Sequence, residues 1–112
     1  MRPPLLARPI VIHIRRDLAE MTSGAILALM WRKLTPRMEN DYRAGFITAS
    51  VSDVVSMVPR NQTELWPARI VTLKWWNGIE RDAVVSVDEH GEPLVTLGLP
   101  KTVPGQQKAQ SE

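Results

Sequence analysis

A run of polar side chains between positions 60 and 66 offers the clearest chemistry in this sequence. Arginine can donate to the acceptors of guanine, and asparagine or glutamine can pair with adenine through two hydrogen bonds. Polar residues of this kind also fill exposed turns, so the run is compatible with a solvated loop as well as with base recognition. The candidate base-contacting residues are Arg60, Asn61, Gln62, Thr63, Glu64 and Trp66.

Other side chains could bind the phosphate groups of a nucleic acid. Ser52 and Arg69 could each hold a phosphate, which would fix orientation without reading sequence. An arginine-bearing arm near the N-terminus could enter a minor groove, although such arms are often simply solvated. The arm residues are Arg2, Arg8, Arg15 and Arg16.

Charge is divided unevenly along the chain. Residues 1–74 carry eleven Lys and Arg against six Asp and Glu, a balance of +5. Residues 75–112 carry three against six, a balance of −3. A basic body suits a surface that faces phosphates, and a modest imbalance is also ordinary for a globular domain.

Residue types that support catalysis or metal binding are scarce. The chain contains no cysteine, and His13 and His90 are its two histidines. The sequence has no His, Cys and Asp cluster with metal-ligand spacing, no phosphate-binding loop and no recognisable pair of nucleophile and base. We therefore expect no enzyme activity, no metal and no cofactor.

The first half of the chain predicts mostly helix. Thr22 or Ser23 can cap a helix, because each hydroxyl can accept from a free N–H of the first turn. Thr35 and Pro36 are expected to end that helix, because proline disfavours helix in the residue before it. The expected elements are a strand at 10–14, helical turns at 15–21, a helix at 23–34, a loop at 36–45 and a short strand at 46–48.

The second half predicts two further helices and a hairpin. Ser50 and Asp53 match a capping box, and Pro59 would close the helix that they open. Asn77 and Gly78 can stop a later, largely buried helix in a left-handed conformation. The expected elements are a helix at 50–58, a polar turn at 60–63, a helix at 64–76, and strands at 81–87 and 94–99 joined by a turn at 88–93.

This order of elements is that of a winged helix-turn-helix. Residues 23–31 read Ser-Gly-Ala-Ile-Leu-Ala-Leu-Met-Trp, and residues 68–73 read Ala-Arg-Ile-Val-Thr-Leu before a turn into residues 78–81. With these segments, the chain from about 9 to 99 resembles the winged-helix domains of phage and plasmid replication initiators and related accessory proteins.

The resemblance implies an α+β fold, with three or four helices and a C-terminal β-hairpin wing. It implies a cytoplasmic protein that binds double-stranded DNA and regulates replication or transcription in a phage, plasmid or bacterial setting. The polar run at 60–66 would then face the major groove. Three departures weaken the match: Asn77 stands where a glycine is usual, Pro67 lies inside the recognition helix, and the wing carries the acidic residues Asp82, Asp88, Glu89 and Glu92.

A different fold competes with the winged helix. Asn77-Gly78 is also a strong signal for a tight β-hairpin. In that case residues 68–76, 79–87 and 94–99 form a three-stranded meander, and Pro67 sits harmlessly just before the first strand. The alternative function, for a winged helix or for this meander, is a protein-interaction adaptor or inhibitor without direct DNA binding.

Two adjacent tryptophans are candidates for an interface. On a helix, Trp75 and Trp76 would point about 100° apart, so one could pack in the core while the other stays exposed. An exposed tryptophan often anchors a protein partner, such as a second copy of the chain. The alternative is a broad apolar face that buries both.

The bulk properties predict one small domain. We expect a flexible basic arm at 1–8, a domain at 9–99 and a disordered polar tail at 100–112. No apolar run approaches the roughly 20 residues needed to span a bilayer, and the N-terminus lacks the pattern of a secretory signal. The lack of cysteine suits a reducing cytoplasm.

Overall fold

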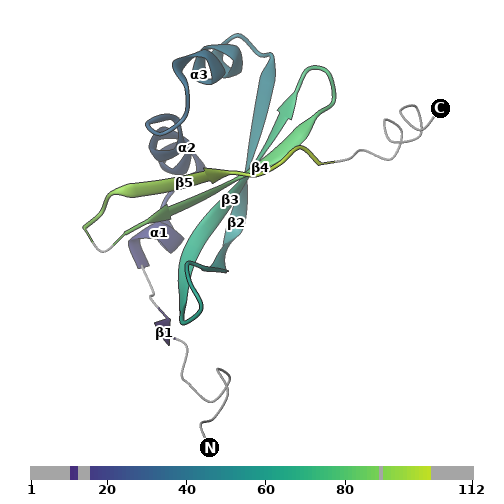
Figure 1. Ribbon diagram of the computed structural model, residues 1–112. Helices are drawn as coiled ribbons and strands as arrows, with labels where there is room; N and C mark the ends of the chain where they lie inside the picture. Colours follow the sequence, from purple (N-terminus) through teal and green to yellow (C-terminus); the bar gives the residue numbers. More distant parts are fainter. Residues whose placement is uncertain (1–10, 13–15, 89, 102–112) are drawn as a thin grey trace, which may run out of the picture.

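Helices form the first half of the described chain, and an antiparallel sheet forms the second half (Figure 1). The computed structural model describes residues 11–12, 16–88 and 90–101. The elements within these ranges are β1 (Val11–Ile12), α1 (Arg16–Glu20), α2 (Ser23–Trp31), α3 (Pro36–Arg43), β2 (Ile47–Pro59), β3 (Glu64–Trp75), β4 (Glu80–Val87) and β5 (Pro93–Leu97).

The sheet is a meander in which each strand pairs with the next one along the chain. Its order is β2-β3-β4-β5, with every neighbouring pair antiparallel. The short strand β1 pairs in parallel with the start of β3, where Val11 lies opposite Glu64. The prediction of a winged helix-turn-helix is therefore wrong, because the two segments expected to form its helix pair are strands.

The segment at 50–58 is part of β2 and not a helix. Its β-branched residues favour an extended chain, and Ser50, the expected N-cap, pairs with β3 instead. The pairing of β2 with β3 shifts between Val51 and Val55. Within this bulge the Ser52 hydroxyl donates to the Val54 carbonyl and accepts from the Val54 N–H. Serine often bonds to nearby backbone in this way, and here it stabilises the bulge.

The segment at 64–76 forms β3, which ends at Trp75, and Asn77-Gly78 lie in a tight β-hairpin turn after it. The Trp75 N–H donates to the Ile79 carbonyl at 2.8 Å, and the Gly78 N–H donates to the Trp75 carbonyl at 2.9 Å. Gly78 has φ 91°, as expected for a three-residue hairpin loop that ends in a left-handed glycine. The alternative meander is thus confirmed for β3, β4 and β5, and β2 adds a fourth strand that it did not include.

Among the helices, the sequence predicts the starts better than the ends. The Thr22 side chain caps α2 as expected, since it accepts from the Ala25 N–H at 3.1 Å. Thr35 and Pro36 do not lead into a loop. Thr35 caps α3 by accepting from the Met38 N–H, and Pro36 occupies the first helical turn, where its missing N–H is not needed.

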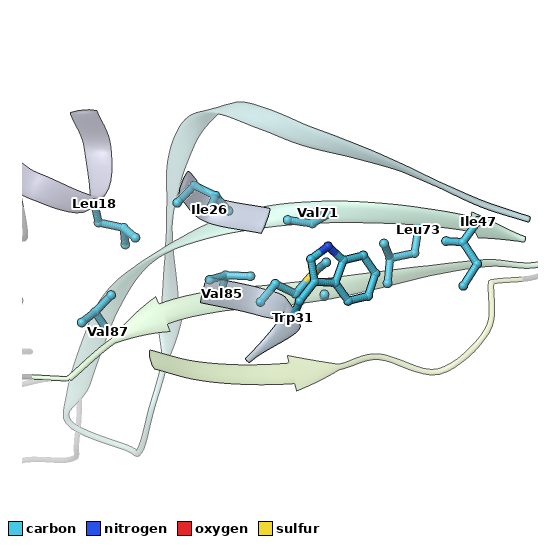
Figure 2. Close-up of a cluster of buried hydrophobic side chains, with 10 residues drawn as sticks. Leu18, Ile26, Trp31, Ile47, Val71, Leu73, Val85 and Val87 are labelled. Carbon is cyan, nitrogen blue, oxygen red and sulfur yellow. The ribbon is translucent and has the colours of Figure 1, made fainter. Parts of the chain in front are cut away.

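The core lies between the helices and one face of the sheet (Figure 2). Side chains alternate between the two faces of a strand, so β3 presents Val71 and Leu73 to the helices, and β4 presents Ala83 and Val85. The residues buried in this cluster are Leu18, Ile26, Met30, Trp31, Ile47, Val71, Leu73, Ala83, Val85 and Val87.

Several predictions concern residues that the structure does not describe. The arm at 1–8 with Arg2 and Arg8 lies outside the described residues, as do Arg15 and most of the tail. The strand predicted at 10–14 is described at Val11–Ile12 alone. At the other end, Lys101 forms a β-bridge with Glu80, and its ammonium lies 2.9 Å from the Asp82 carboxylate.

Two glycines provide a test of this backbone. Gly91, in the β4–β5 loop, has φ 83°, whereas Gly24 lies in α2, and an added Cβ would meet nothing within 4 Å at either position. We expect Gly91→Ala to lower the free energy of unfolding by about 1–2 kcal/mol, because left-handed backbone disfavours alanine. Gly24→Ala should raise it by about 0.5 kcal/mol. Equal effects in urea-induced unfolding would contradict this hairpin geometry.

Candidate functional site

The polar run at 60–63 forms the tight turn between β2 and β3. The Arg60 N–H donates to the Glu64 carbonyl at 3.1 Å. The Asn61 side chain accepts from both the N–H and the hydroxyl of Thr63, and donates to the Glu64 carboxylate at 2.6 Å. Most of the polar groups in this run therefore close the hairpin, whereas Gln62 is exposed.

Trp66 lies on β3 directly after this turn. The guanidinium of Arg60 lies 5.4 Å from the centre of the Trp66 ring, within the range of a cation–π contact. The indole is half-buried. The structure thus brings the predicted base-contacting residues together at one hairpin, but on a turn between strands and not at the start of a helix.

Ser52 and Arg69, the two predicted phosphate contacts, meet each other. Arg69 is 4% exposed, and its Nε donates to the Ser52 carbonyl at 2.9 Å. Its Nη1 points to the end of α1, where it lies 3.2 Å from the Leu18 carbonyl, 3.5 Å from that of Ala19 and 3.1 Å from that of Met21. All four of these acceptors are backbone oxygens.

These hydrogen bonds give Arg69 a structural role, because they connect β3 to α1 and β2. The last carbonyls of a helix lack partners within the helix, and a cation beside them is also favoured by the helix dipole. Arg69 satisfies such carbonyls at α1 and, through Ser52, a carbonyl freed by the β2 bulge. The side chain therefore joins the helical layer to two strands, and its donors are directed to the protein's own backbone.

β3 ends at Trp75, so the adjacent Trp76 belongs to the turn that follows. Trp75 is half-buried and packs against the core, whereas Trp76 is 76% exposed. The Trp76 N–H donates to the Phe46 carbonyl at 2.9 Å, and Phe46 is 54% exposed. At the same end of the sheet, Leu99 follows β5 and is 86% exposed. We call Phe46, Trp76 and Leu99 the apolar end of the sheet.

A shallow pocket lies at this end of the sheet. It has a volume of about 260 Å³ and lies between Trp75, the β3–β4 hairpin and the segment after β5. The Arg81 side chain forms part of its wall and is held there, since its Nε donates to the Gly98 carbonyl at 2.7 Å. The lining residues are Trp75, Asn77, Ile79, Arg81 and Pro100.

A larger groove between α2 and α3 was not foreseen, because residues 36–45 were predicted to be a loop. The groove measures about 450 Å³, and the rings of Trp31 and Tyr42 meet along it with centroids 5.2 Å apart. At its rim Arg43 donates to Glu39 at 2.8 Å, and this hydrogen bond, with the charge of Glu39, raises the pKa of Arg43. The groove therefore offers an apolar wall beside an ion pair that is already satisfied.

Comparison of the chain with protein-family models, with curated proteins and with solved structures found no match. Within the described ranges, every helix falls short of the length and apolar character that a membrane span requires.

The buried arginine gives a direct test. We expect Arg69→Met to lower the free energy of unfolding by about 3 kcal/mol, because it leaves several buried carbonyls without a donor. Arg37→Met, the same change at an exposed position of α3, should have an effect within about 0.5 kcal/mol. Guanidinium unfolding followed by circular dichroism measures both. An Arg69→Met variant as stable as the parent would show that the guanidinium does not hold the two layers together.

Proposed function

We propose that this chain is a protein-binding module that docks through the apolar end of its sheet. The observation that carries the proposal is the exposure of Trp76, which is 76% accessible at the tip of a hairpin held by backbone hydrogen bonds. A large aromatic side chain on a rigid turn loses little conformational freedom on binding. Tryptophan is accordingly among the residues that contribute most at protein interfaces.

The surroundings of Trp76 support the same function. Phe46 and Leu99 add exposed apolar area at the same end of the sheet, and the pocket beside Trp75 could accept one side chain of a partner. Clustered apolar residues rimmed by polar ones are typical of interaction sites. The rim includes Lys74 and Asn77, which are exposed, and Arg81 in the pocket wall.

The DNA-binding hypothesis has lost its geometric support. It required a recognition helix at 64–76, and that segment is a central strand of the sheet. The side chains of Asn61 and Arg69, which were to contact DNA, bond to the protein itself. A protein partner is therefore the better candidate. Separately, the lack of cysteine supports a place in the reducing cytoplasm.

Substitution at the hairpin tip tests the proposal. With the chain as bait, a protein partner that binds directly should be retained by the parent and lost with Trp76→Ser. For the purified partner, we expect the dissociation constant to rise at least tenfold, as for a central interface residue. The stability of the variant should be unchanged, because the indole is exposed.

Gln62→Ser is the matched control, because it removes an exposed side chain from the β2–β3 hairpin, at the other end of the sheet. It should leave the affinity for that partner intact. The proposal fails if Trp76→Ser binds every captured protein as well as the parent does, or if Gln62→Ser weakens binding equally.

A further inference from the structure

The two edges of the sheet differ in how they are protected. β5 is five residues long and begins with Pro93, both features that discourage pairing with another strand. β2 is thirteen residues long, and in the described part of the chain its outer edge pairs with no strand. Proline occurs in β2 only at Pro59, and Asp53 is its one charged residue. The outer edge of β2 is thus open to a further strand.

The pairing with β3 shows which backbone groups of β2 face outward. In an antiparallel ladder, successive residues of an edge strand direct their N–H and C=O alternately toward the neighbour and away from it. The Arg60 N–H points inward, to the Glu64 carbonyl. Beyond the bulge, where the register is regular, Ser56 and Val58 therefore also face β3. Val55 and Met57 direct their N–H and C=O groups outward.

The sequence of this stretch is close to a palindrome. Residues 54–58 read Val-Val-Ser-Met-Val, with an apolar pair on each side of Ser56. Antiparallel pairing of two copies about Ser56 would place Val55 opposite Met57 of the second copy, and Val54 opposite Val58. The outward groups of Val55 and Met57 would then form four backbone hydrogen bonds with their equivalents.

We propose that two copies of this chain form a two-fold symmetric dimer by pairing residues 54–58 of β2 edge to edge, centred on Ser56. The partner is a second copy because the apolar pairs and the outward backbone groups of this stretch are complementary to those of an identical strand. A symmetric interface of this kind closes on two molecules. The four-stranded meanders would then join into one continuous sheet.

The absence of native cysteine makes the register measurable. Ser56→Cys would place two thiols opposite each other at a position where the Cα atoms of paired strands are about 4.5 Å apart, a separation that a disulfide can span. We expect mild oxidation to convert most of this variant into a covalent dimer. Ser50→Cys, on the same strand, and Thr96→Cys, on β5, should remain largely uncrosslinked.

The unmodified protein should have twice the 12.6 kDa mass of one chain in light scattering. A monomeric mass throughout a concentration series, or equal crosslinking at positions 50, 56 and 96, would overturn the proposal. Circular dichroism of each variant separates a lost interface from a lost fold. The Trp76 experiment is independent of these results.

Discussion

A buried guanidinium is the constraint on which the arrangement of this protein depends. A cation that is 4% exposed must find acceptors inside the protein, since water cannot supply them. Arg69 finds them at the end of α1 and at Ser52, and both features are shaped accordingly. The bulge turns the Ser52 carbonyl toward the arginine, and α1 ends above the sheet. Because the bulge interrupts β2, it also separates the half of that strand beside α3 from the half that holds residues 55–58.

The sequence predicts those elements whose signals are local. The cap at Thr22, the helical turn of α1 and the strands β4 and β5 follow from such signals, as does the hairpin at Asn77-Gly78 when it is read as one. The segments at 50–58 and 64–76 were misassigned because apolar residues in nearly continuous runs fit a buried helix or a buried strand equally well. Pro67 was expected just before the strand, but it lies within β3, opposite Met57. It is accommodated there because the pairing of β3 with β4 begins only at Arg69.

The functional surfaces were only partly accessible to sequence reasoning. Trp75 and Trp76 could be recognised as an interface candidate, but which of them is exposed depends on the hairpin. Ser52 and Arg69 were predicted to hold phosphates, whereas the structure directs the Arg69 side chain to backbone carbonyls, that of Ser52 among them. Their partners were not foreseeable, because Arg69 bonds to Leu18, 51 residues earlier in the chain. The groove between α2 and α3 was missed because Pro36 begins a helix where it was expected to end one.

The length of β2 has a consequence for how partners could be arranged. Phe46 bonds to Trp76 and Met57 lies opposite Pro67, so the two surfaces are nine residues of β3, or about 30 Å, apart at the usual rise of a strand. A pair of molecules joined at one end of this strand would present two tryptophan tips at the outer ends of a single rigid platform. Such a platform can engage a repetitive or multimeric target at two points, which strengthens attachment through avidity without any new contact.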